Sequence, residues 1–308
     1  MLMTRPQTTA LSTTYTQLHI DAARYATDDF NPFHDKLRWH RIVGNPFAGP
    51  LVLGFQQAAF LEDALRQHRL AQGESALLRQ HGLDYSNYQF AFAGAVLPGQ
   101  TVQAEVRSSR FEPGQNPQLS NRVLLRADGA PVLLGFKRES AAPLLDLPLP
   151  AAADGLATWP DRSYLPDGRT FLKRKFVMTA NGKTFLLGAG VEPSVYIDEI
   201  EDRIGFPEMF PLSYLSCALL ERGVHAGYKF ANAPMVYAAH RYSISRRRMA
   251  GVASNTALNI LIGEPTVSGT GAALRHTYRC HIVLADGAVL SSAEVVLAPL
   301  AALCSAGG

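Results

Sequence analysis

Two stretches of alternating apolar residues, 158 positions apart, share the central sequence Ala-Asp-Gly-Ala. Residues 123–134 read VLLRADGAPVLL, and residues 282–292 read IVLADGAVLSS. Because Asp-Gly can supply the two positive φ angles of a type I′ turn, each stretch predicts a β-hairpin.

The same offset relates two helix-like runs. Residues 54–66 read GFQQAAFLEDALR, with apolar residues largely at helical spacing, and residues 212–224 read LSYLSCALLERGV. Pro211 stands just before the second run, near a helix start, where proline is tolerated. A helix and a hairpin that agree on one offset indicate an internal duplication.

Strand-like runs follow each helix-like run. They cover residues 88–92, 101–107, 119–126 and 132–138 in the first half, and 235–244, 256–262, 272–284 and 289–297 in the second. One long helix followed by an antiparallel meander is an α+β pattern, and a sheet wrapped around a central helix is the hot-dog arrangement. We therefore predict a tandem (double) hot-dog fold, in which each central helix is apolar nearly all round because the sheet encloses it.

The boundary between the halves is predicted from proline. Residues 141–161 contain four prolines, which restrict the backbone and favour an extended connection. We expect an N-terminal domain over residues 1–150 and a C-terminal domain over residues 151–308. The alternative is a long surface loop within a single domain.

Composition excludes few classes of function. Of the 308 residues, 47% are hydrophobic and 18% are charged, which is enough apolar material for two cores. The net charge of +3 makes no general case for nucleic acid. The three cysteines lack metal-ligand spacing, the N-terminus lacks the apolar core of a secretory signal, and no apolar run reaches the roughly 20 residues of a membrane span. We expect a cytoplasmic protein without membrane or nucleic-acid partners.

The segment with the clearest chemistry is residues 25–35, YATDDFNPFHD. Asp29 and Asn31 are turn formers whose side chains can accept hydrogen bonds from nearby amides, and Pro32 stiffens the loop. A stiff loop can hold the Asp29 carboxylate beside the His34 imidazole, a pair suited to proton transfer. The alternative is an ordinary Asx turn with His34 on the surface.

This segment resembles the MaoC-like hydratases and dehydratases, which carry Asp-x-Asn-Pro-x-His between the first strand and the central helix. Asp29, Asn31, Pro32 and His34 occupy those places, and residues 47–54 (FAGPLVLG) resemble the family's run into the helix. The likeness is specific over about residues 15–65.

The resemblance implies a hydratase or dehydratase acting on an acyl thioester, with no metal or redox cofactor. Asp29 and His34 would handle water and the proton at C2. The amide of Gly54, at the helix start, would donate to the thioester oxygen, unless this glycine serves close packing only. The remaining predicted substrate-binding residues are Asn31, Pro50, Leu53, Phe55, Arg246 and Arg248.

Arg246 and Arg248 belong to a basic cluster at residues 246–248, and a second basic cluster lies at residues 173–175. Either could bind the phosphates of coenzyme A or the acidic face of an acyl-carrier protein. Solvated charge on a strand or loop is the alternative for both.

The chain departs from the family pattern in several places. Asp28 stands where glycine is frequent, Leu53 where histidine is frequent, and residues 36–41 are bulky. In the second half, the offset carries Asp29 onto Leu187 and His34 onto Glu192, so the element is absent. We expect that half to shape the acyl tunnel through residues 185–191 and 206–214, with core packing as the alternative.

Two other functions are compatible with the sequence. A hot-dog thioesterase would use a carboxylate on the central helix, for which Glu62 or Asp63 is available. A non-catalytic subunit of a biosynthetic assembly would explain the departures. The expected substrate is acyl-CoA or an acyl-carrier protein, and the chain would be a monomer or a homodimer.

Overall fold

The computed structural model describes residues 9–153 and 155–304. The first half contains β1 (Thr9–Thr14), α1 (Gln17–Thr27), α2 (Gly54–Ala71), α3 (Ser75–Gln80), β2 (Tyr85–Phe92), β3 (Thr101–Val106), β4 (Arg110–Glu112), β5 (Gln118–Ala127) and β6 (Ala130–Ser140). The second contains β7 (Ser163–Tyr164), β8 (Phe171–Phe176), α4 (Thr179–Gly188), β9 (Ile197–Asp198), β10 (Arg203–Ile204), α5 (Met209–His225), β11 (Met235–Ser245), α6 (Arg246–Ala250), β12 (Ala257–Ile262), β13 (Thr266–Ser268), β14 (Arg275–Leu284), β15 (Val289–Pro299) and α7 (Ala301–Cys304).

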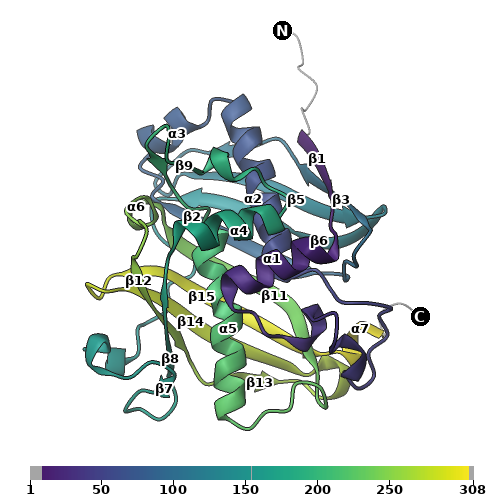
Figure 1. The fold of residues 1–308 in the computed structure, drawn as a ribbon. Coiled ribbons are helices and arrows are strands. Elements are labelled where there is room, and N and C mark those ends of the chain that lie inside the picture. The colour runs from purple at the N-terminus through teal and green to yellow at the C-terminus, as the bar shows by residue number, and fades with distance from the viewer. Residues whose placement is uncertain (1–8, 154, 305–308) are drawn as a thin grey trace.

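One antiparallel sheet runs through both halves in the order β1-β3-β5-β6-β2-β11-β15-β14-β12-β8-β7, with β4 and β13 paired to β5 and β14 (Figure 1). The halves meet where β2 pairs with β11, for example at Tyr88 opposite Tyr242. The two meanders therefore form a continuous surface.

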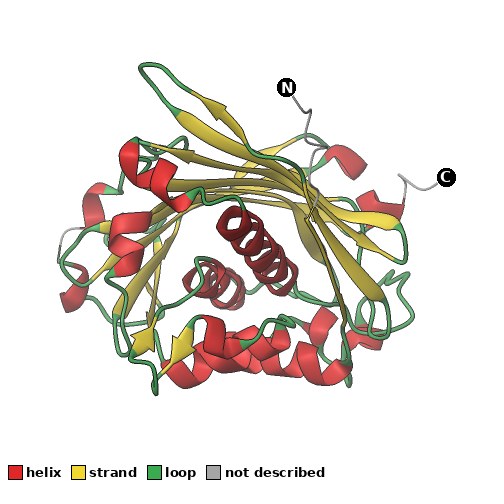
Figure 2. Cartoon of the chain, turned by 90° about the horizontal axis from the view of Figure 1, so that it is seen from above, coloured by secondary structure: helices red, strands yellow, loops and turns green. Residues whose placement is uncertain are grey.

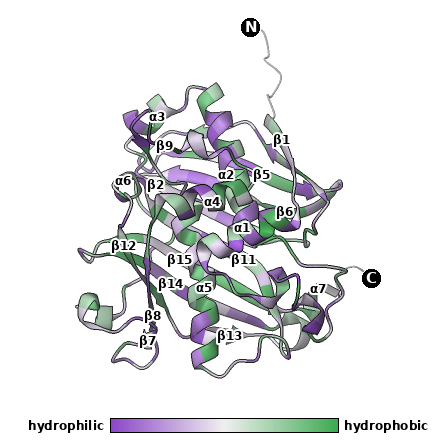
Figure 3. Ribbon diagram, in the orientation of Figure 1, coloured by the Kyte–Doolittle hydropathy of each residue, from purple (hydrophilic) through white to green (hydrophobic). Residues whose placement is uncertain are grey.

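The sheet curves around α2 and α5, and the outer helices, including α1 and α4, close its concave side (Figure 2). The strands carry both hydrophilic and hydrophobic residues (Figure 3), and buried and more exposed positions alternate most regularly along β3 and β5, as expected for a sheet with one face on the core. Of the helices in the described part of the chain, none is long and apolar enough to cross a membrane.

All eight predicted strands are present, with bounds shifted by at most a few residues. The two hairpins also form, but their turns differ. Asp128 and Gly129 both have positive φ in a two-residue loop, as predicted. The second loop has four residues and only Gly287 has positive φ, so the type I′ prediction is wrong there.

The prediction that the central helices are apolar nearly all round needs correction for α2. This helix is buried on nearly every side, yet its buried residues include glutamines and charged residues. They form hydrogen bonds that offset the cost of burial: Gln56 donates to the Gly188 carbonyl at 2.5 Å, and Arg69 pairs with Glu139. A helix enclosed by a sheet can therefore be polar where partners are built in.

The apolar pattern did not predict α1 or α4, which pack against each other. Thr16 caps α1, accepting from the His19 amide while the His19 ring accepts from the Thr16 amide. The chain between β6 and β7, apart from residue 154, contains two short 3₁₀ turns, and the amide of Leu145 donates to Ser243 on β11.

Candidate active site

The segment that carries the predicted acid and base is built from two successive Asx turns. After α1 ends, Asp28 adopts φ 54° and the Asp29 amide donates to the Arg24 carbonyl at 2.8 Å. The Asp29 carboxylate accepts from the Asn31 amide at 2.9 Å, and the Asn31 side chain accepts from the Phe33 amide at 3.1 Å. A 3₁₀ turn at Pro32–His34 follows. These local bonds fix the loop, as its residue types predicted.

His34 is buried, with 7% of its surface exposed. Its Nδ1 lies 2.8 Å from the Leu51 carbonyl oxygen. A carbonyl can only accept, so Nδ1 carries the hydrogen and Nε2 is left free to accept a proton. Burial lowers the pKa of His34, and the nearby negative charge of Asp29 opposes that shift.

Asp29 is held from the other half of the molecule. Ser216, on α5, donates from Oγ to Oδ2 of Asp29 at 2.6 Å. Both carboxylate oxygens therefore have a donor, since Oδ1 accepts from Asn31. Asp29 is 4% exposed and borders a hollow shared with Tyr25 and His225, whereas Ser216 and His34 line a separate pocket.

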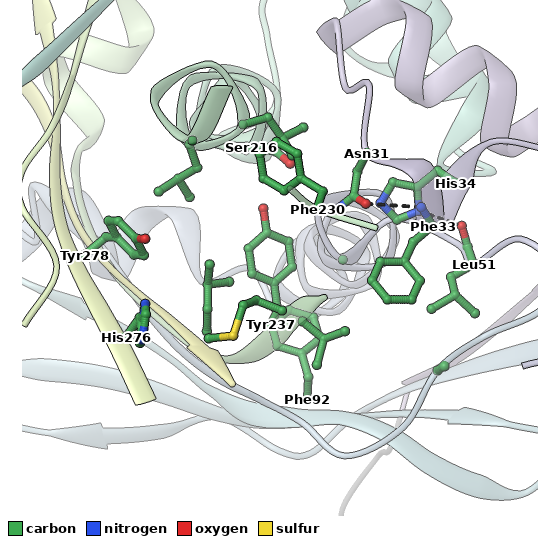
Figure 4. A pocket seen from close by; sticks show the side chains of 18 of the residues that line it. Asn31, Phe33, His34, Leu51, Phe92, Ser216, Phe230, Tyr237, His276 and Tyr278 are labelled. Atoms are coloured by element: carbon green, nitrogen blue, oxygen red, sulfur yellow. Dashed lines mark hydrogen bonds between the residues drawn. The ribbon is translucent and has the colours of Figure 1, made fainter. Parts of the chain in front are cut away.

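This pocket has a volume of about 180 Å³. Figure 4 shows His34, Asn31 and Leu51 on one side, with His276 and Tyr278 on the other. Its wall is mainly apolar and also includes Phe33, Val52, Phe92, Leu219, Leu220, Phe230, Met235, Val236, Tyr237 and Leu297. A mainly apolar wall with a limited set of polar side chains suits an apolar chain that carries one polar group.

Two groups at the start of α2 line the same pocket. Gly54 is the first helical residue, so its N–H has no intrahelical acceptor. A Cβ at Gly54 would lie 3.0 Å from the Phe92 ring and 3.1 Å from the Tyr237 ring, so the glycine allows both rings to pack there. Gln57 is 3% exposed, and its Nε2 donates to the Val52 carbonyl while its Oε1 has no hydrogen-bond partner. Around the start of α2, the Gly54 N–H therefore lacks an intrahelical acceptor, and His34 Nε2 and the buried Gln57 Oε1 have no hydrogen-bond partner among the described residues.

The predicted substrate-binding residues divide into three groups. Asn31 lines the pocket. Pro50, Leu53 and Phe55 are buried beside it without lining it, and Phe55 stacks on the His240 ring.

Arg246 and Arg248 are not brought to the pocket. They follow the far end of β11, whose first residue, Met235, lies in the pocket wall. The eleven residues of β11 span about 35 Å. Arg246 and Arg248 donate instead to the carbonyls of Leu83 and Val289.

Asp28, a departure from the family pattern, pairs with Lys175 of β8. The negative charge of Asp28 is therefore paired with Lys175, which limits its effect on the neighbouring carboxylate of Asp29. Lys173, from the same basic cluster, is 4% exposed and pairs with Glu221 at 3.2 Å. Both lysines of this cluster therefore have acidic partners within the protein.

The second half repeats the turn without its chemistry. Glu192 accepts from the Ser194 amide and begins a 3₁₀ turn at Pro193–Val195, as Asn31 begins Pro32–His34. When the two 3₁₀ turns are aligned, Val195 takes the place of His34. The constant offset of 158 had instead placed Glu192 there. Phe185, Phe206 and Phe210 pack on one another in the core and do not line the pocket.

Glu62 and Asp63, the carboxylates considered for a thioesterase, are engaged elsewhere. Glu62 accepts from the amides of Glu208 and Met209 at 2.7 and 2.9 Å, and so caps the start of α5. Burial, followed by the charge of Glu208, raises the pKa of Glu62 to about 8. Asp63 accepts from Arg66 and Gln67. Neither residue lines the pocket.

Sequence reasoning missed Ser216, Gln57 and Tyr237. Two of them had a weak signal, because Ser216 and Gln57 are polar residues within helices that the pattern predicted to be enclosed. The Tyr237 hydroxyl points toward Ser216 (Figure 4). Its position depends on the pairing of strands from different halves, which local pattern does not reveal.

Solved structures share the fold of this chain. A double hot-dog protein from Mycobacterium tuberculosis aligns over 97% of this chain and 97% of its own, at 12% identity and a TM-score of 0.59. A putative MaoC domain protein dehydratase from Chloroflexus aurantiacus aligns over 96% of both chains, at 11% identity and a TM-score of 0.58. A putative oleoyl thioesterase from Lactobacillus plantarum aligns over 96% of both, at 10% identity and a TM-score of 0.52. No family model and no curated protein matches the sequence.

The chain is thus a double hot-dog protein. The tandem fold and the resemblance to MaoC-like proteins are confirmed at the level of fold. Because proteins named as dehydratases and as a thioesterase share it, the reaction must be argued from the site.

Proposed function

We propose that this protein adds water to, or removes it from, the C2–C3 bond of an acyl thioester carried by coenzyme A or an acyl-carrier protein. The observation that carries the proposal is the set of free groups in one apolar pocket: the Gly54 amide as donor, with His34 Nε2 and Gln57 Oε1 as acceptors. This set matches a thioester oxygen and the two hydrogens of a water molecule.

In hydration, the thioester oxygen accepts a hydrogen bond from the Gly54 N–H, which stabilises enolate charge. Water donates to His34 and Gln57, and its oxygen attacks C3 as one proton passes to His34 Nε2. The electron pair of the double bond moves to the enolate, and His34 then returns the proton to C2. Dehydration is the reverse.

Asp29 acts on this cycle as a positioning residue rather than as the group that touches water. Its negative charge raises the pKa of His34 against the effect of burial and so stabilises the imidazolium that forms. Ser216 joins Asp29 to the pocket wall.

The test is turnover of a series of enoyl thioesters, followed by loss of absorbance of the conjugated bond. We expect hydration by the wild type and its loss in His34→Ala, with release of free thiol measured in parallel. Absence of hydration at every chain length, or full activity in His34→Ala, would refute the proposal. Thiol release without hydration would instead support a thioesterase, for which the engagement of Glu62 and Asp63 is unfavourable.

A further inference from the structure

Arg222 of α5 lines the pocket with a positive charge that has no acidic partner among the described residues. Its Nε is buried and has no hydrogen-bond acceptor. The preceding residue, Glu221, is directed elsewhere, pairing with Lys173 and Arg162, each at 3.2 Å. Arg222 is half-buried, and its charge lacks an acidic partner beside this pocket among the described residues.

Arg222 lies at the end of the pocket remote from His34. Its guanidinium carbon is 5.7 Å from the centre of the Tyr278 ring and 5.8 Å from that of Tyr164. Figure 4 places Tyr278 across the pocket from His34. Arg222 is six positions after Ser216 on α5, a rise of about 9 Å along the helix axis. The pocket thus has a reactive end and a cationic end.

A buried guanidinium nitrogen without an acceptor is costly, and the two tyrosine rings offer only cation–π attraction. The planar guanidinium is suited to carboxylate and phosphate oxygens. We infer that Arg222 binds an anionic oxygen group of the substrate at the end of the pocket remote from His34. The identity of that substrate as a thioester rests on the proposed function.

The anionic oxygen has two chemical sources in such a substrate. One is a carboxylate at the far end of the acyl chain. The other is a phosphate of the carrier. Binding of saturated thioesters separates these sources and requires no turnover.

Three probes are compared by titration calorimetry: octanoyl-CoA, the mono-CoA thioester of octanedioic acid, and S-octanoyl pantetheine, which lacks phosphate. The proteins are the wild type, Arg222→Met, Arg222→Lys and the control Arg279→Met. Arg279 is adjacent to Tyr278 and, by strand alternation, faces the other side of the sheet. We expect Arg222→Met to weaken binding of an anionic probe by about 10–100-fold, Arg222→Lys to weaken it less, and the control to leave it unchanged.

If Arg222→Met loses affinity only for the octanedioic thioester, the bound group is an acyl carboxylate. If it loses affinity for both CoA probes but not for the pantetheine thioester, the bound group is a phosphate. Equal dissociation constants in the wild type, Arg222→Met and Arg222→Lys for all probes would overturn the inference. Thermal melting checks folding, and if Arg222→Met does not fold, Arg222→Lys decides. A protein that binds with this pattern but hydrates nothing would refute the proposed function while upholding the role of Arg222.

Discussion

The bond between Ser216 and Asp29 joins the two halves at the site, and its removal tests the proposed mechanism most directly. Ser216→Ala deletes the donor to Oδ2, while Oδ1 keeps the Asn31 amide, so the turn is retained. A buried hydrogen bond to a charged group contributes about 1.5–3 kcal/mol. At 1.4 kcal/mol per tenfold, we expect kcat/KM for hydration to fall by about 10–100-fold.

Ser213→Ala is the matched control. Ser213 lies one turn earlier on α5, is 2% exposed, and donates to the Phe210 carbonyl rather than to a site residue. We expect it to cost some stability in chemical denaturation but little activity. If both variants lose the same stability and the same kcat/KM, or if Ser216→Ala loses stability alone, the role of Ser216 in the reaction is refuted.

Three further predictions follow from the buried polar groups. Gln57→Leu removes an unpaired acceptor and also the bond that Nε2 donates to the Val52 carbonyl. We therefore expect the free energy of unfolding to change by no more than about 1 kcal/mol while kcat/KM falls about tenfold; an unchanged kcat/KM would contradict its role. Because burial lowers the pKa of His34, the acid limb of the kcat/KM profile should lie below pH 6.5, and Asp29→Asn should move it lower still; a shift upward would be inconsistent with the charge effect. The pKa of Glu62 is raised from 4.5 to about 8, so protonated Glu62 contributes to the free energy of unfolding, and this contribution, at most about 5 kcal/mol, is lost as pH rises through that window. Glu62→Gln should flatten the fall of the free energy of unfolding with pH. An unchanged slope of that free energy against pH would argue against the raised pKa.

Alternating apolar residues predicted the strands because each faces one core, and the Asp-Gly turns located the hairpins. The local turn around Asp29, Asn31 and His34 was also predictable, since its bonds join residues close in sequence. By contrast, α4 contains asparagine, glycine and threonine, and its packing against α1 is a tertiary effect that local propensity does not carry.

The site residues that were missed depend on long-range contacts. Ser216 reaches Asp29 across 187 positions, a distance over which no spacing rule holds. The arginines at 246 and 248 were placed at the site by charge alone, although the length of β11 carries them away from it. A cluster of charged residues in a sequence indicates what it could bind, but it does not show where in the fold the cluster lies.

Asp29 borders one hollow and is bonded to Ser216 in the wall of the other, which has a consequence for how the site can be closed. An acyl chain bound in the pocket would block that pocket. Asp29 would still border the second hollow, beside Tyr25 and His225. The acyl chain would then shield the reacting end from water without covering the carboxylate that positions His34, so each cavity would have a task of its own.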